Sequence, residues 1–370
     1  MNADVAVIGA GLVGAAIGYG LASRGVDVVV LDGEDRDFRA ANANFGLVWL
    51  HAKGLEMPAY RHLTRGSVLL WPEFSAELSS ATNLDLEYEQ TGGLGLCLGE
   101  EEFERRRTLM SRLDVGADPD WEMLDHDALS KLLPKARLGP AVTGASFGRR
   151  DGHANPLRLL AALHAGIIRR GGRLRGGSVV RSVNADGHGS FAIEFGNERL
   201  SAGRVVIAAG LGSKALAAQV GLDVPLRPQR GQILVTERLE PFLPLPMADM
   251  RQTRDGTVMM GTTNEEAGFD GSTTVEAAAA ISDTALQSIP ALSEATLVRQ
   301  WAGLRILTPD GFPIYAESPR DPGAFVALCH SGVTLAAMHA GLLAEGIAAG
   351  RLPSQLDVFH PRRFDVPKAA

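Results

Sequence analysis

A glycine-spaced turn joins two short apolar segments at the N-terminus of the chain. Residues 4–8 (Asp-Val-Ala-Val-Ile) and 26–31 (Val-Asp-Val-Val-Val-Leu) are typical of buried parallel strands, because both are mostly apolar and rich in β-branched side chains. Between them, Gly9-Ala-Gly11-Leu-Val-Gly14 leads into residues 15–22, which predict a helix. The pattern therefore predicts a βαβ unit whose second strand ends on an acidic residue, Asp32.

Such a unit is typical of dinucleotide binding, and each glycine has a physical role in it. Gly9 permits the tight turn, Gly11 lets the backbone approach a pyrophosphate, and Gly14 lets the helix pack on the strand. The carboxylate of Asp32 is suited to accepting hydrogen bonds from ribose hydroxyls and disfavours a bound 2′-phosphate. The predicted contacts of this unit are Gly9, Gly11, Leu12, Val13, Gly14 and Asp32. The unit alone does not distinguish FAD from NAD.

Three later segments resemble the D-amino-acid oxidase and glycine oxidase family of flavoenzymes along nearly the full length of the chain. They are Arg39-Ala-Ala-Asn-Ala-Asn44-Phe-Gly46-Leu47, Arg204-Val-Val-Ile-Ala-Ala-Gly210 and Phe325-Val-Ala-Leu-Cys-His-Ser-Gly-Val-Thr334. An NAD enzyme does not need three further chain segments that come back to contact the same cofactor, so the resemblance implies FAD. The contacts that it implies are Arg39, Ala40, Asn44, Phe45, Gly46, Leu47, Val180 (or its neighbour Val179), Ala208, Gly210, Arg305, Ser331, Gly332, Val333 and Thr334.

The cofactor segments are spread over the whole chain, so neither predicted domain is contiguous. We expect an α/β fold in which residues 1–76, 147–222 and 296–370 form a Rossmann-like FAD-binding domain of the glutathione-reductase type. Residues 77–146 and 223–295 are expected to form the substrate domain, which the resemblance implies is an antiparallel sheet over the flavin. Predicted strands include residues 93–98, 231–236 and 257–261, and predicted helices include 157–170, 277–288 and an amphipathic stretch over 334–349.

Arg305 is the leading candidate for substrate binding. It lies in the largely apolar sequence Trp-Ala-Gly-Leu-Arg305-Ile-Leu, where we expect a guanidinium to pair with a carboxylate or bind an anion. In the resembling enzymes, the arginine of this Gly-x-Arg pattern forks onto the substrate carboxylate. The proline that usually follows it is Ile306 here. A structural ion pair, for example with Asp310, is the competing interpretation.

Candidates for acid–base catalysis are His51 and His330, together with Lys53. His51 and Lys53 follow the segment expected beneath the flavin, and His330 opens the C-terminal loop. A histidine in such places is often only a hydrogen-bonded packing residue, so both a structural and a catalytic role remain open. The chain has two distant cysteines, Cys97 and Cys329, and no CxxC pair. We therefore expect neither a bound metal nor an iron–sulfur cluster on this chain.

The predicted function is FAD-dependent oxidation of the Cα–N bond of a small carboxylated amine, by hydride transfer to flavin N5. The segment from Asn44 to Gly54 resembles the β subunits of D-hydroxyproline and opine dehydrogenases, so the substrate classes are a D-amino acid, a proline-type amino acid or an opine. A self-sufficient oxidase that makes hydrogen peroxide is the alternative. A flavin monooxygenase is disfavoured because no second GxGxxG unit is present, and a non-catalytic FAD subunit is disfavoured by Arg305.

The resemblance also bears on where the electrons go. Sarcosine oxidases of the family carry a lysine above the flavin in a Lys-x-Gly strand, and Met259 stands at the similar position here. We therefore predict slow oxygen reactivity and a hetero-oligomer with an electron-accepting subunit, with an FMN at a subunit interface as a further expectation. The net charge of −7 argues against nucleic acid as a partner. No transmembrane segment is expected, and the predicted location is the cytoplasm, including the inner-membrane periphery.

Overall fold

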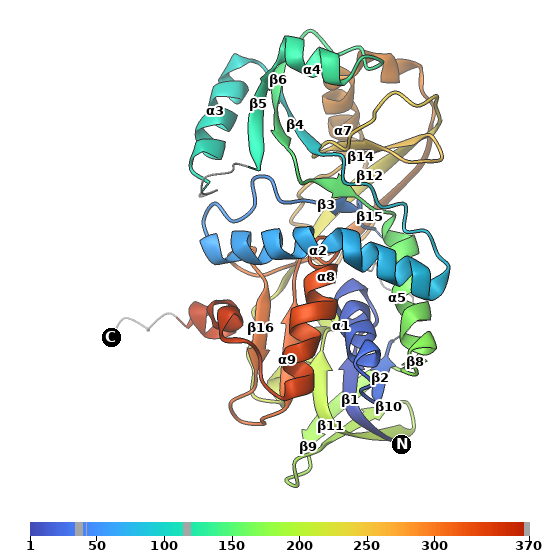
Figure 1. Cartoon of the computed structure of the whole chain (residues 1–370), viewed down its shortest axis with the longest axis vertical. Helices are drawn as coiled ribbons and strands as arrows, with labels where there is room; N and C mark the ends of the chain where they lie inside the picture. Colours follow the sequence, from blue (N-terminus) through green and yellow to red (C-terminus); the bar gives the residue numbers. More distant parts are fainter. Residues whose placement is uncertain (34–39, 42, 114–119, 366–370) are drawn as a thin grey trace.

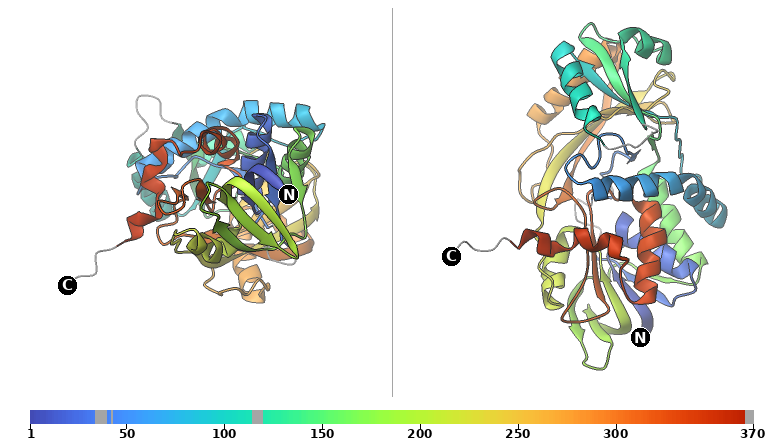
Figure 2. Two further views of the ribbon diagram at one scale, coloured as in Figure 1. Left: turned by 90° about the horizontal axis from the view of Figure 1, so that it is seen from below. Right: turned by 60° about the vertical axis from the view of Figure 1, so that its left-hand side comes forward.

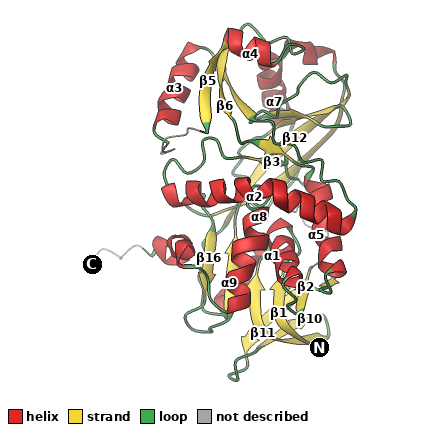
Figure 3. Ribbon diagram, in the orientation of Figure 1, coloured by secondary structure: helices red, strands yellow, loops and turns green. Residues whose placement is uncertain are grey.

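The computed structural model describes residues 1–33, 40–41, 43–113 and 120–365. The molecule is elongated, and two groups of strands lie above and below the long helix α2 (Pro58–Thr82), as Figures 1 and 3 show. The side view of Figure 2 places the same helix between the two halves. Arg39 lies outside the described residues, so its predicted contact with the cofactor stays a prediction.

The lower half is built on an eight-stranded sheet. Its main path runs β16 (Ile314–Glu317), β17 (Ala324–Leu328), β11 (Glu198–Ile207), β1 (Asn2–Ile8), β2 (Val28–Leu31) and β8 (Arg173–Arg175). The neighbours from β17 to β8 pair in parallel, and β16 is antiparallel. An antiparallel hairpin of β9 (Val180–Ala185) and β10 (Phe191–Phe195) extends from β11. Strands β2 and β17 are buried and apolar along their whole length, as are residues 5–8 of β1 and 205–207 of β11, whereas the other ends of β1 and β11 carry polar and charged residues.

Helices cover both faces of this sheet. One face packs against α1 (Leu12–Ser23), α2, α5 (Pro156–Arg169) and the C-terminal helices α8 (Ala336–Met338) and α9 (Ala344–Ala349), which share one hydrophobic core. The short helix α6 (Ser213–Gln219) packs on the other face, together with the β9–β10 hairpin. Figure 1 shows α1, α8 and α9 side by side in front of β1 and β11. No helix within the described ranges is long and apolar enough to cross a membrane.

The upper half holds two antiparallel sheets. The larger has the order β13 (Met250–Gln252), β14 (Thr257–Gly261), β12 (Arg227–Arg238) and β15 (Leu297–Leu307), and the smaller has the order β4 (Gly93–Leu98), β6 (Val142–Gly148) and β5 (Trp121–Asp125). The helices α3 (Glu100–Ser111), α4 (His126–Leu132) and α7 (Val275–Ser288) flank them. A separate two-stranded ladder, β3 (Leu47–Val48) with β7 (Gly152–His153), lies between the halves.

The predicted α/β fold is confirmed, with a parallel sheet and separate antiparallel sheets. The strands expected at residues 93–98 and 257–261 have those bounds, and the helix expected at 277–288 begins two residues earlier, at Val275. The domain boundaries stay a prediction, and two elements connect the predicted domains across them. Helix α2 continues past residue 76, and β15 lies beyond residue 296 yet pairs with β12 of the antiparallel sheet.

The C-terminal stretch departs from the expected amphipathic helix. Most residues from 332 to 349 are buried, and the helix is interrupted by a π-helical turn at His339–Leu343. Most of the segment is covered because α1 and α2 both pack on it, while Glu345 stays exposed. His339, for example, is fully buried and hydrogen-bonds the hydroxyl of Tyr315 at 2.8 Å.

Candidate functional site

The turn between β1 and α1 is closed tightly by backbone contacts. Gly9 has a φ of +103°, a region that favours glycine, and a side chain there would overlap the carbonyl oxygen of Ala208. A side chain at Gly14 would overlap the carbonyl oxygen of Gly9. The amide of Ala208 donates to the carbonyl oxygen of Ile8 at 2.8 Å, so the turn after β11 lies directly against the glycine turn. Two of the three motif glycines are thus required by the protein's own packing.

Gly11 differs from the other two glycines. It caps the N-terminus of α1 with φ −67° and ψ 179°, an extended conformation open to any residue. No atom of the described residues lies within 4 Å of where its Cβ would be. Neither the backbone nor the packing of these residues demands glycine, while the amides at the start of α1 have no side-chain cap. The open space beside a helix N-terminus fits the pyrophosphate of a dinucleotide such as FAD.

Asp32 lies half-buried at the end of β2, where the ribose contact was predicted. Its carboxylate accepts from the amide of Gly33 at 3.0 Å, and its backbone carbonyl accepts from the amide of Ser178. This second bond brings the start of β9 next to Asp32. Val179 lies closest, 3.5 Å from the Cβ position of Gly33, while the side chain of Val180 packs on the core of the lower half. The predicted adenine contact of Val180 stays a prediction.

A cavity of about 260 Å³ opens between the two halves of the molecule. Its walls come from the segment after β2, from β12 and β15, and from the C-terminal loop. The predicted site residues that line it are Ala40, Asn44, Phe45, Leu47, Arg305, His330, Ser331, Val333 and Thr334. Gly46 and Gly332 lie beside these lining residues in sequence. The glycine turn, Asp32, Val180, Ala208, Gly210 and His51 are not part of its wall.

Hydrogen bonds hold the segment after β2 against the C-terminal loop. The hydroxyl of Thr334 accepts from the amide of Trp49 at 3.1 Å and donates to the carbonyl oxygen of Leu47 at 3.2 Å. The side-chain oxygen of Asn44 accepts from the amide of Gly46 at 2.7 Å, and this bond fixes the turn at residues 44–46. Two segments that are almost 300 residues apart therefore form one wall of the cavity.

Arg305 extends from β15 over β12. Its guanidinium donates to the carbonyl oxygens of Thr263 at 2.8 Å and Arg230 at 3.3 Å, and to the hydroxyl of Thr262. None of the described carboxylates forms an ion pair with it, and Asp310 pairs with Arg363 at 2.7 Å instead. The competing interpretation, an Arg305–Asp310 pair, is wrong. Burial lowers the pKa of Arg305, and the nearby carboxylate of Glu265 opposes that shift.

Gly231 is a site residue that the sequence did not indicate. It lies on β12 beside Arg305, and a side chain there would overlap the guanidinium. The absence of a Cβ lets the planar group lie flat against the strand, with one edge held by backbone oxygens. A glycine inside a strand is the available signal, because it often marks a close approach. Thr262 is the second site residue that the sequence did not indicate. It directly follows strand β14, and a threonine in that place matches no sequence pattern that marks a site.

His330 borders the cavity near two cations. His330 is an exposed residue of the cavity wall, but desolvation by the surrounding protein, and then the charges of Lys53 and Arg305, lower the pKa of His330 to about 3. The neutral imidazole is therefore the form present near neutral pH.

We expect His330 to contribute no ionisation to catalysis between pH 5 and pH 8. Because its pKa lies below this window, His330→Gln should keep the shape of the pH profile of kcat/KM, even if the value falls. The measurement is that profile in the wild type and in the variant, with the same reducing substrate. A wild-type ionisation near pH 6–7 that vanishes in His330→Gln would contradict the expectation.

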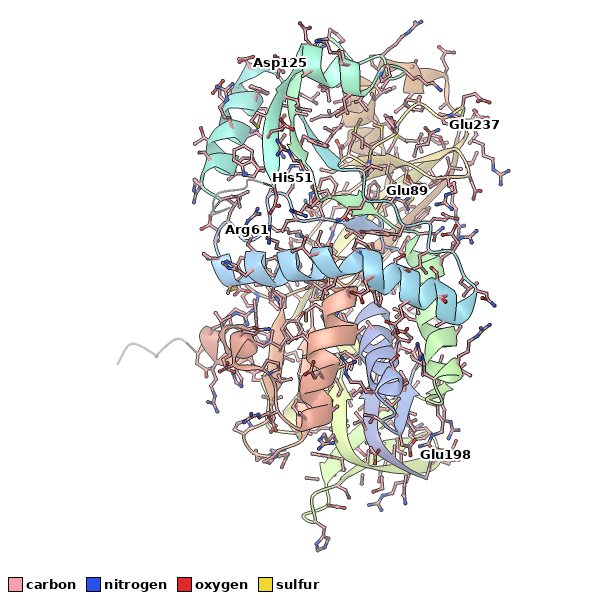
Figure 4. All side chains as sticks on the ribbon, in the orientation of Figure 1. His51, Arg61, Glu89, Asp125, Glu198 and Glu237 are labelled. Atoms are coloured by element: carbon pink, nitrogen blue, oxygen red, sulfur yellow. The ribbon has the colours of Figure 1, made fainter. Side chains whose placement is uncertain are left out.

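His51 lies in a buried network behind the cavity wall. Its Nδ1 contacts the carboxylate of Asp151 at 2.8 Å, its Nε2 contacts the hydroxyl of Ser146 at 2.8 Å, and its ring stacks on that of Trp49 with centroids 5.1 Å apart. In Figure 4, His51 lies above α2, on the side of the upper sheets. Trp49 itself lines the cavity. The structure thus places His51 where it supports a wall residue rather than the cavity directly.

Comparison with known proteins agrees with this arrangement. Residues 4–346 match the family described as FAD dependent oxidoreductase (DAO). The chain is 42% identical to an opine oxidase subunit of Agrobacterium tumefaciens (strain Ach5) over 99% of both chains. It is 28% identical to glycine oxidase of Pseudomonas putida (strain KT2440) over 91% of this chain and 92% of the relative. The crystal structure of glycine oxidase from Geobacillus kaustophilus superposes with a TM-score of 0.89 at 24% identity, covering 100% of this chain and 99% of that one. The chain therefore belongs to the DAO family of FAD-dependent oxidoreductases.

Proposed function

We propose that this protein oxidises the Cα–N bond of a small carboxylated amine to the imine, with FAD as the hydride acceptor. The observation that carries the proposal is the guanidinium of Arg305, which lines the cavity without an ion-pair partner among the described carboxylates. The names of two relatives, an opine oxidase subunit and a glycine oxidase, support an amino-acid-type substrate. When bound, FAD supplies the hydride acceptor at its N5 atom.

The residues of the chain contribute binding and orientation. Two oxygen atoms of the backbone and the hydroxyl of Thr262 hold Arg305, which leaves it donors with which to bind a carboxylate. Fixing the carboxylate would hold the substrate Cα in one position relative to the cofactor. This orientation is the main contribution that the protein makes to a flavin amine oxidation. The neutral ring of His330 can accept a hydrogen bond from an N–H of the bound amine.

The proposal is tested by mixing the purified, FAD-loaded protein with amines in the absence of oxygen. We expect bleaching of the flavin absorption by a D-amino acid, a proline-type amino acid or an opine, and none by the matching amines without a carboxylate. A panel in which none of the carboxylated amines bleaches the flavin would contradict the proposal.

We further propose that the chain is the catalytic subunit of a hetero-oligomer. The support is the name of the relative that is 42% identical, which describes a subunit of an oxidase. The partner would accept the electrons that leave the flavin. An FMN at the interface with that partner stays a prediction that no comparison supports.

Slow oxygen reactivity is the expected result for the isolated chain. Met259 packs against Phe45, Ile233 and Val235 on the cavity side of the antiparallel sheet, so this position offers no cation to a developing superoxide. The measurement is stopped-flow reoxidation of the substrate-reduced protein in air-saturated buffer. Reoxidation should be slower than reduction by substrate.

A self-sufficient oxidase is the second candidate, and the relationship to glycine oxidase favours it. Reoxidation as fast as turnover, with stoichiometric hydrogen peroxide from the isolated chain, would establish the oxidase and remove the need for a partner subunit.

A further inference from the structure

Lys53 is a second cation in the wall of the cavity. Its Nζ donates to the hydroxyl of Ser331 at 3.2 Å and lies 6.0 Å from the ring centroid of Tyr60. The hydroxyls of Tyr60 and Ser331 are themselves hydrogen-bonded at 2.8 Å. Within the described parts of the chain, no carboxylate forms an ion pair with Lys53. The ammonium is thus held in place by neutral groups, and its charge is left without a counterion.

The cavity therefore contains more positive charge than one carboxylate would balance. Arg305 and Lys53 both line it, and both lower the pKa of the neighbouring His330. Like charges in a partly buried space repel each other, and holding two of them there costs free energy unless anions enter. If Arg305 takes one carboxylate, the charge of Lys53 remains.

We propose that Lys53 binds a second anionic group of the substrate, so that the preferred substrate is a dicarboxylated amine. This proposal rests on the proposed function, because it assigns the first carboxylate to Arg305. An ammonium suits this position, since one of its three N–H donors binds Ser331 and the other two are available for an oxygen anion. Lys53 and Arg305 reach the cavity from different walls, the segment after β3 and strand β15, so they are placed to hold the two ends of one molecule.

The test compares dicarboxylated and monocarboxylated amines of similar size. The probes are a series of N-(carboxyalkyl)alanines of increasing length, with N-ethylalanine as the monocarboxylated reference. The readout is kcat/KM for anaerobic flavin reduction. The wild type should prefer the best diacid by about 10- to 100-fold, the range of one charge-assisted hydrogen bond. Lys53→Met should lower kcat/KM for the best diacid far more than for N-ethylalanine and so remove this preference, and Lys53→Arg should restore part of it.

Lys214→Met is the matched control. Lys214 is exposed on α6, away from the cavity wall, so its loss removes the same charge without touching the site. This variant should retain the wild-type preference. If Lys53→Met slowed reduction by monoacids and diacids equally, Lys53 would act on the cofactor or on folding, and the proposal would be overturned. Equal wild-type activity on both classes would overturn it as well, while the proposed amine oxidation would stand.

A binding experiment separates the two proposals. Ethers cannot be oxidised as amines are, so oxydiacetate and methoxyacetate report binding alone, through the change in the absorption spectrum of the oxidised flavin. Oxydiacetate should bind more tightly than methoxyacetate, and Lys53→Met should abolish the difference. If no amine bleached the flavin but this pattern appeared, the proposed oxidation would fail while the second anion site survived. If Lys53→Met left the difference unchanged, the second anion site would fail.

Discussion

Arg305→Ala should lower kcat/KM for a carboxylated amine by roughly 30- to 1000-fold, which corresponds to about 2–4 kcal/mol of lost binding in the transition state. The reason is that, in the proposed binding mode, the guanidinium presents two parallel donors to the substrate carboxylate in a partly desolvated cavity. Anaerobic flavin reduction, followed over a range of substrate concentrations, measures the change. Near-normal reduction by Arg305→Ala would mean that the substrate is held elsewhere.

Further variants distinguish the loss of the two parallel hydrogen bonds from a general loss of folded protein. Arg305→Lys should recover little, because a point charge does not reproduce the planar pair of donors. Gly231→Ala keeps the arginine but places a methyl group where the guanidinium lies, so it should also lower kcat/KM. Arg299→Ala is the control, since Arg299 is an exposed residue of the same strand, β15, and its loss should leave kcat/KM unchanged.

Gly11→Val should yield a folded protein that does not retain FAD. The extended backbone of Gly11 accepts valine, and none of the described atoms lies within 4 Å of the new Cβ. The isopropyl group would instead fill the space beside the start of α1 that we assign to the pyrophosphate. The measurement is the ratio of flavin to protein absorbance after purification, together with the circular dichroism of the same sample.

Gly66→Val provides the matched control for this change. Gly66 is exposed on α2 and also has no atom within 4 Å of its Cβ position among the described residues, so the added bulk meets no cofactor. It should show only the small effect of valine on helix stability and keep its flavin. A Gly11→Val protein with stoichiometric FAD would show that the pyrophosphate does not lie at the start of α1.

The amino-acid sequence by itself determined the βαβ unit, several strands and the candidate Arg305. Local patterns carry these features: buried strands are continuous apolar runs, the glycine spacing marks the turn, and a lone arginine in an apolar flank predicts an ion pair or a bound anion. Residues 93–98 and 257–261 were predicted with their observed bounds for the same reason. The resemblance to a family added the other segments that are predicted to face the cofactor.

Only the tertiary structure decided which of these residues meet. Three features depend on elements that are distant in sequence. They are the position of His51 behind Trp49, the ion pair of Asp310 and the close packing of the Arg305 guanidinium against Gly231. The same holds for β15, which pairs with β12, and for residues 332–349, most of which are buried by α1 and α2. Sequence patterns report whether a residue prefers burial, but they do not report which surface buries it. That choice is made by long-range packing, and it leaves Lys53 and Arg305 in the wall of one cavity.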